Sequence, residues 1–250
     1  MNEVIDQSNF IVNKGCSGTL IDKELQLILT NYHCIDGQIE FVERDVFEDG
    51  RVTTIREVRL RPVNVEQVHY EGYGEVGTSS YVTDIVARKK TRDLAVLKVR
   101  GSLPQEFESP LIKPGKDVTR GERVYAVGNP AGFDATVVEG IVSSTTRTFE
   151  FPWTENEELP MIQFSGGITG GNSGGALYNT EGVLVGVPAA GLRGANFIGL
   201  AIPPHIIWEV LAEHCLAEDL GGENSDLYCD EEGERKVSEE QLDDGEGTNE

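Results

Sequence analysis

An isolated serine, Ser173, lies in the glycine-dense stretch GGITGGNSGG, which runs from residue 166 to residue 175. A serine hydroxyl is a poor nucleophile at neutral pH, so a reacting serine needs a histidine base within hydrogen-bond reach and an acid that orients the histidine. The stretch therefore has two interpretations. It is either a flexible glycine-rich hairpin or a backbone shaped around a reacting hydroxyl.

Few side chains are available as partners for this serine, because the chain has only four histidines: His33, His69, His205 and His214. His33 follows an apolar run in ILTNYHC, and Asp93 opens the alternating apolar pattern of DLAVLKV. Each signal is weak alone, since a histidine at a strand end is usually structural and an aspartate before a strand is usually a turn residue. Together, in the order His33, Asp93, Ser173, they favour nucleophilic catalysis by a Ser-His-Asp combination.

The elements that must position these residues are mostly short strands. Up to about residue 203, β-branched runs alternate with Gly, Pro, Asn and Asp, which is typical of an all-β barrel or sandwich. About a dozen such runs are too many for one small barrel, and the segment 100–122 contains three prolines and no clean period. The pattern predicts two β-lobes joined by a crossover. One helix is expected in PPHIIWEVLAEHCLAED, where apolar residues recur at helical spacing after two prolines.

Seven segments scattered between about residues 15 and 210 carry a family resemblance: GCSGTLID, ILTNYHC, RDLAVLKV, VYAVGNPAGFDATVVEGIVSS, GGNSGGAL, LVGVPAAG and GLAIPP. They resemble trypsin/chymotrypsin-fold serine peptidases, and most of all the HtrA (Deg) branch. The resemblance implies an all-β fold of two six-stranded Greek-key β-barrels. The C-terminal α-helix is expected from its apolar spacing, and an acidic disordered tail is expected from the high charge and few apolar residues after residue 220. The expected boundaries are a peptidase domain at 1–220 (N-lobe about 10–105, crossover 106–122, C-lobe 123–203, helix 204–218) and a tail at 221–250.

The resemblance also implies roles for individual residues. Ser173 would be the nucleophile, His33 the general base and then acid, and Asp93 the carboxylate that fixes the imidazole tautomer. The oxyanion hole would be formed at Gly171, Asn172 and Ser173, with the N–H groups of Gly171 and Ser173 pointing into one small cavity. The glycines then have a reason, because side chains there would block either the turn or the substrate.

The specificity pocket can be predicted in part from the same resemblance. Trypsin-like members that bind a basic side chain have an aspartate six residues before the nucleophile, where this chain has Gly167, followed by the apolar Ile168. Gly191 and Gly199 match positions that line the same pocket. We therefore expect cleavage after small or medium aliphatic residues such as Val, Ala, Ile or Leu. The backbone of residues 189–191 (Ala189, Ala190 and Gly191) is expected to pair with the substrate as an added strand.

The resemblance places Cys16 and Cys34 where chymotrypsin-like enzymes have a disulfide that brackets the histidine loop. A chain without an export signal normally keeps its cysteines as thiols, so the sequence leaves both states open. No spacing of histidines and cysteines resembles a zinc site, and we expect no metal and no cofactor.

The net charge of the chain and the pattern of its N-terminal residues limit the partners and the location that we expect. The formal net charge is −22, and residues 216–250 alone carry 14 acidic against 2 basic residues. This charge repels phosphates and disfavours a nucleic-acid partner. No apolar run approaches the ~20 residues of a membrane span, and the N-terminus has no secretory pattern, so no membrane contact and a cytoplasmic location are expected by default. The expected partners are polypeptide substrates, with a homo-oligomer left open. The tail is either simply solvated or a docking segment.

Two other functions fit parts of the sequence. Gly-Asn-Ser-Gly-Gly also fits the nucleophile elbow of α/β-hydrolases, but that fold needs alternating strands and helices and an acid before a histidine after the serine, where only Glu181 precedes His205. The second is a protease-fold binding scaffold that no longer cleaves. The 60-residue span from His33 to Asp93 keeps this function open, because it contains an insertion at 44–80. Three roles are possible for the insertion: it forms a simple surface hairpin, it covers the cleft, or it holds a partner. Too little chain follows residue 218 for the PDZ domain that HtrA proteases usually append.

Overall fold

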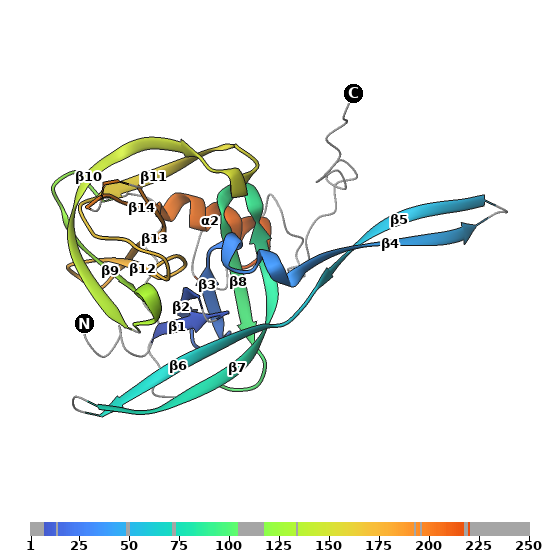
Figure 1. Cartoon of the computed structure of the whole chain (residues 1–250), viewed down its shortest axis with the longest axis horizontal. Coiled ribbons are helices and arrows are strands. Elements are labelled where there is room, and N and C mark those ends of the chain that lie inside the picture. The colour runs from blue at the N-terminus through green and yellow to red at the C-terminus, as the bar shows by residue number, and fades with distance from the viewer. Residues whose placement is uncertain are drawn as a thin grey trace.

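The computed structural model of the chain describes residues 8–13, 15–48, 51–71, 74–104, 118–133, 135–192, 194–195, 197–217 and 220. Most of the predicted crossover and the whole predicted tail at 221–250 lie outside the described residues. The described chain forms two closed six-stranded barrels, one C-terminal helix and a separate two-stranded sheet (Figure 1). The predicted two-barrel fold is confirmed.

The first barrel has the strand order β1-β2-β3-β8-β7-β6. Its strands are β1 (Asn9–Val12), β2 (Cys16–Asp22), β3 (Leu27–Thr30), β6 (Val63–Glu71), β7 (Gly74–Lys89) and β8 (Leu94–Val99). Pairing of Ile11 with Glu66 closes the barrel between β1 and β6. Successive side chains of a strand point to opposite faces. In β3, Ile28 therefore packs inside the barrel, whereas Leu27 and Leu29 pack outside it, in a cluster shared with the second barrel.

The second barrel has the strand order β10-β11-β14-β13-β12-β9. Its strands are β9 (Arg123–Gly128), β10 (Thr136–Glu150), β11 (Glu158–Phe164), β12 (Ala176–Asn179), β13 (Leu184–Gly191) and β14 (Gly199–Ile202). Its interior contains fully buried apolar side chains, including Val124, Phe164 and Leu177. β10 and β11 form a long hairpin that reaches toward the first barrel (Figure 1).

The helix α2 (Pro204–Glu213) packs against the cluster between the barrels. Pro204 occupies its first turn, where a missing N–H costs nothing, and Ile207 and Leu211 are fully buried. The helix ends at Glu213, short of the predicted 218, because Cys215 has a φ of 59° and cannot continue a right-handed helix. No helix among the described residues is long and apolar enough to cross a membrane.

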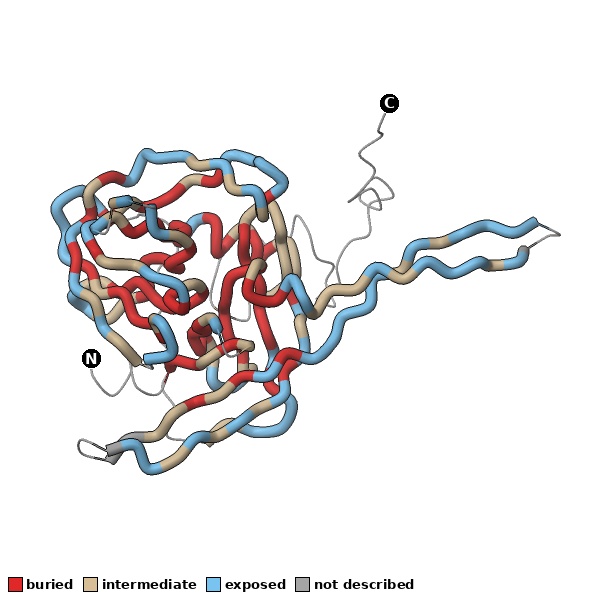
Figure 2. The backbone as a smooth tube through the Cα atoms, viewed as in Figure 1, coloured by how far each residue is buried: buried red, intermediate tan, exposed pale blue. Residues whose placement is uncertain are grey.

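The insertion at 44–80 divides between two hairpins. β4 (Ile39–Glu48) and β5 (Arg51–Leu60) pair only with each other, in a ribbon that projects away from both barrels (Figure 1). Figure 2 shows the ribbon almost entirely exposed, and Phe47 is 72% exposed. The rest of the insertion continues into β6 and β7 of the first barrel. The arrangement matches the surface-hairpin alternative.

Candidate active site

His33 is positioned by a short turn at the end of β3. The strand runs into the 3₁₀ turn η1 (Tyr32–Cys34), whose Tyr32 and Cys34 are buried while His33 stays partly exposed. Asn31, fully buried before the turn, donates from Nδ2 to the backbone carbonyl of Asp93 at 2.9 Å. Burial raises the pKa of the Tyr32 phenol, so this buried side chain of the turn stays neutral. The residues that precede the imidazole therefore hold the turn in place.

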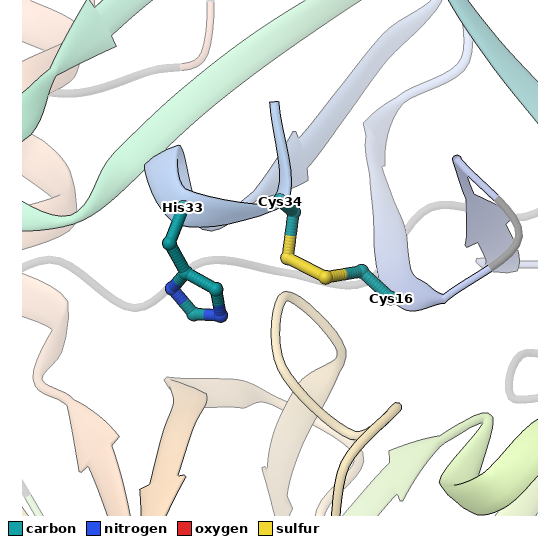
Figure 3. Close-up of side chains that lie close together, drawn as sticks. All are labelled: Cys16, His33 and Cys34. Carbon is teal, nitrogen blue, oxygen red and sulfur yellow. A yellow bond between two sulfur atoms is a disulfide. The ribbon is translucent and has the colours of Figure 1, made fainter. Parts of the chain in front are cut away.

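A disulfide joins Cys34 of this turn to Cys16 of β2 (Figure 3). The imidazole of His33 projects beside the disulfide, on the same side of the turn (Figure 3). The ring nitrogen of His33 and the two sulfurs lie within 4.8 Å of one another. Because both sulfurs are bonded to each other, neither is the thiolate that a metal site would need. The bonded pair is one of the two states that the sequence left open.

Asp93 faces His33 from the loop before β8. It follows the 3₁₀ turn η3 (Lys90–Arg92), has a left-handed φ of 51° and is fully buried. Its Oδ1 accepts a hydrogen bond from the backbone N–H of His33 at 3.0 Å, and its two oxygens lie 3.0 and 2.9 Å from His33 Nδ1. A carboxylate is an acceptor only, so Nδ1 carries a proton in this pair, and in the neutral imidazole the free lone pair is on Nε2. The geometry suits an imidazole that acts as a base through Nε2.

Ser173 is held against the His33 turn by backbone contacts. Its carbonyl accepts from the N–H of Ser17 at 2.8 Å and lies 3.7 Å from Cys34 Sγ. Its hydroxyl donates to the carbonyl of Ala189 at 3.2 Å rather than to His33. Ser173 therefore lies beside Cys34, the residue that follows His33, and its hydroxyl must leave Ala189 before it can donate to Nε2.

The glycines around Ser173 are required by close backbone contacts. Gly171 has a φ of 106°, and an added Cβ would lie 2.1 Å from the carbonyl oxygen of Asn129. Gly174 has a φ of 83°, and its Cβ would lie 2.2 Å from the carbonyl oxygen of Ser17. Ser17 also donates from Oγ to the carbonyl of Gly171 at 2.7 Å. The loop is thus packed and fixed rather than slack, and the hairpin interpretation of the sequence is not supported.

The N–H groups of this loop divide into two kinds. The Asn172 N–H donates to the carbonyl of Thr169 at 3.2 Å, and Asn172 is fully buried, so this predicted member of the oxyanion hole is occupied within the loop. Within the described parts of the chain, the N–H groups of Gly171 and Ser173 have no internal acceptor. Of the three predicted members, Gly171 and Ser173 thus keep N–H groups without an acceptor among the described residues, and Asn172 does not.

The predicted pocket residues gather around Ile168. A Cβ on Gly191 would lie 2.6 Å from the carbonyl oxygen of Ile168, and a Cβ on Gly199 would lie 2.7 Å from Ile168 Cγ1. Gly191 and Gly199 are paired across β13 and β14, and Ala190 precedes Gly191 in the same strand. Gly167, directly before Ile168, is half-buried. The backbone of Ile168 therefore lies against Gly191, and its apolar side chain lies against Gly199 beside the ring of Phe164.

Sequence reasoning missed one side chain that touches the candidate site. Trp153 lies in the 3₁₀ turn η5 (Pro152–Thr154), between β10 and β11, and donates from Nε1 to Asp93 Oδ2 at 3.0 Å. Its ring also lies 5.4 Å from that of His33, centroid to centroid. The available signal was the alternation of aromatic residues in FEFPW at 149–153, which predicts a strand face but not its partner.

Comparison with known proteins identifies sequence relatives. The model of the trypsin-like peptidase domain family matches residues 16–187, more than half of the chain. The putative serine protease HhoA of Synechocystis sp. is 32% identical over 189 residues, covering 75% of this chain and 39% of the relative. A probable periplasmic serine endoprotease DegP-like of Marinomonas sp. is 35% identical over 136 residues, covering 52% of this chain and 27% of the relative. The chain thus spans less than half of the length of either relative.

Solved structures show the same fold. The protease domain of MamO from Magnetospirillum magneticum superposes with a TM-score of 0.63 at 18% identity, covering 84% of this chain and 98% of that one. The crystal structure of Deg5 gives a TM-score of 0.58 at 26% identity, covering 83% and 88%.

Proposed function

The chain belongs to the trypsin-like peptidase family, with HtrA- and DegP-type proteins among its relatives, and we propose that it is a serine endopeptidase. The observation that carries the proposal is the buried carboxylate of Asp93 at 2.9 and 3.0 Å from His33 Nδ1. This pair leaves Nε2 of His33 as the basic nitrogen. Ser173 lies beside the turn that carries His33, and its backbone is fixed there by the bond from the Ser17 N–H. A binding scaffold that never cleaves would not require such a pair.

In the proposed reaction, the Ser173 hydroxyl turns from the Ala189 carbonyl to His33 Nε2 and attacks the carbonyl carbon of the scissile peptide. Nε2 takes the hydroxyl proton, and Asp93 stabilises the imidazolium that forms. Nε2 then gives the proton to the leaving amine, and an acyl-enzyme remains on Ser173 Oγ. A water molecule, activated by the same imidazole, hydrolyses the ester and restores the hydroxyl.

The two free N–H groups, from Gly171 and Ser173, are proposed to hold the tetrahedral oxyanion. Fixed donors of this kind stabilise charge that develops only in the transition state, and loss of one lowers the rate by roughly 10²–10³-fold. The contacts that make glycine necessary at Gly171 also set the direction of its N–H.

The proposed substrate is a polypeptide with a small or medium aliphatic residue before the scissile bond. The apolar Ile168, whose backbone lies against Gly191 and whose side chain lies against Gly199, supports this choice, since it offers no charge for a lysine or arginine side chain. The end of β13 at Ala190 and Gly191 is proposed to pair with the substrate backbone.

The test is hydrolysis of a peptide panel that varies only the residue before the scissile bond. The proposal predicts that Val, Ala, Ile and Leu peptides are cleaved, and that Ser173→Ala abolishes cleavage while the partly exposed control Ser143→Ala does not. Fastest cleavage after lysine or arginine would refute the specificity. Cleavage by Ser173→Ala at the wild-type rate would refute the assignment of Ser173 as the nucleophile.

A further inference from the structure

We propose that Trp153 is a positioning residue for the His33–Asp93 pair, its indole N–H holding the Asp93 carboxylate in the orientation that His33 requires. The inference deepens the proposed function and rests on it. Its basis is the contact of a side chain from the second barrel with the buried acid of the first, through the 3.0 Å bond from Trp153 Nε1 to Asp93 Oδ2.

The hydrogen bonds of Asp93 show what the indole contributes. The backbone N–H of His33 holds Oδ1 at 3.0 Å, whereas His33 Nδ1 lies almost equally close to both oxygens. Trp153 is thus the donor that distinguishes Oδ2 from Oδ1. With Oδ1 and Oδ2 each held by a separate fixed donor, the carboxylate cannot rotate about its Cβ–Cγ bond.

The direction of this bond is unambiguous, because an indole nitrogen only donates and an ionised carboxylate only accepts. Asp93 is fully buried, so removal of the indole N–H would leave Oδ2 with His33 Nδ1 alone, a donor that it shares with Oδ1, in a place that bulk water does not reach. Hydrogen bonds to charged groups are the stronger ones, and losing one from a buried carboxylate is costly.

The indole ring is itself held in place by its neighbours. It stacks on Phe151 with centroids 4.7 Å apart and planes 18° apart, and Phe151 stacks on Phe149 at 6.1 Å. Pro152 opens the turn, and the buried Thr154 closes it with a bond from its hydroxyl to the Phe151 carbonyl at 3.0 Å. The aromatic alternation noted in the sequence therefore fixes the plane in which the N–H points.

The same turn is joined to the loop that carries Asp93. Lys90 Nζ lies 3.1 Å from a Glu155 oxygen, and the Glu155 carboxylate raises the pKa of Lys90. Arg92, next to Asp93 in sequence, lies 3.8 Å from Glu157. Such partly exposed pairs contribute little stability each, but they join the same two segments as the indole bond. The β10–β11 hairpin is thus placed to set the orientation of the acid, and displacement of its tip would misalign the imidazole.

The test compares the same substitution at the chain's two tryptophans. Trp153→Phe removes the N–H and keeps a stacked ring. Trp208→Phe in α2 is the matched control, because Trp208 Nε1 is buried and has no hydrogen-bond partner among the residues that the structure describes. On a valine-containing peptide, Trp153→Phe is expected to lower kcat by about 10- to 100-fold with KM unchanged, the loss expected for one bond to a buried charge. Trp208→Phe is expected to change neither. A wild-type kcat for Trp153→Phe would overturn the inference.

A second readout does not depend on turnover. The downfield NMR resonance of the His33 Nδ1 proton, assigned by its loss in His33→Ala, should move in Trp153→Phe and stay in Trp208→Phe. If the wild type cleaves no peptide, the proposed function fails while this comparison still decides the role of Trp153. An unmoved resonance, or its absence from the wild type, would contradict the inference. If Trp153→Phe does not fold, benzothienylalanine at position 153, which replaces the N–H with sulfur in a ring of the same shape, provides the same comparison.

Discussion

Replacing Gly171 with alanine tests whether the shape of the loop before Ser173 is needed for catalysis. The added Cβ would lie 2.1 Å from the carbonyl oxygen of Asn129 and 3.1 Å from the backbone nitrogen of Ala131. Real Cβ atoms essentially never approach another heavy atom closer than 3.0 Å. One backbone must therefore move by about 1 Å, the distance needed to relieve the repulsion.

Two effects of this change can be estimated. An alanine at a φ of 106° adds backbone strain, and the free energy of unfolding should fall by roughly 1–3 kcal/mol. A shift of about 1 Å also moves the Gly171 N–H away from the oxyanion, and loss of one such donor lowers kcat by roughly 10²–10³-fold. The loss of rate should thus be much larger than the small change in folded population can explain.

The matched control is Gly170→Ala, one residue earlier in the same loop. A Cβ at Gly170 meets nothing within 4 Å, and its φ lies outside the left-handed region. The assay is hydrolysis of a fluorogenic valine peptide, with urea unfolding of each variant. The reasoning is refuted if Gly171→Ala keeps the wild-type kcat, or if Gly170→Ala loses as much.

Four further predictions follow from other parts of the molecule. Cys16→Ala with Cys34→Ala removes a bond that closes an 18-residue separation and should cost about 3 kcal/mol in urea unfolding; an unchanged midpoint would contradict a structural disulfide. Ile168→Gly should raise the ratio of kcat/KM for phenylalanine over valine peptides by about 10-fold or more, and a constant ratio would show that Ile168 does not line the pocket. Burial raises the pKa of Tyr178 to about 12, above its ordinary value of about 10, so the neutral phenol stabilises the fold below about pH 10 and this contribution is lost as the pH rises through 12. Tyr178→Phe should therefore flatten the decline of the unfolding free energy between about pH 9 and 12, and an unaltered slope would contradict that account. Replacing residues 42–57 with a short turn should change Tm by no more than about 3 °C, because β4 and β5 pair only with each other, and loss of folding would show that the ribbon supports the barrel.

Much of the fold could be predicted because its determinants are local. Period-two alternation and turn residues mark the strands of both barrels, and the proline at 204 marks the start of α2. The end of α2 was less predictable, since the left-handed conformation of Cys215 breaks a pattern whose apolar spacing continues. The β4–β5 ribbon was also uncertain, because its alternating residues fit a barrel strand as well as a free hairpin.

The residues of the candidate site also differ in how far the sequence could predict them. His33 and Asp93 could be identified from their short motifs, and the structure brings them into hydrogen-bond contact. Trp153 could not, because its role depends on a contact across 60 residues of sequence between two barrels. The hydroxyl orientation of Ser173 and the internal bond of the Asn172 N–H are set by loop packing, which the glycine pattern alone does not determine.

The most direct test of the central claim is reaction of the folded protein with a fluorophosphonate, followed by mapping of the labelled peptide. A fluorophosphonate reacts with a serine hydroxyl only where a base and an oxyanion site activate it. The account predicts stoichiometric labelling at Ser173, lost in Ser173→Ala and in His33→Ala, and retained in Ser143→Ala. A well-folded wild type that takes no label, or takes it at another serine, would contradict the account.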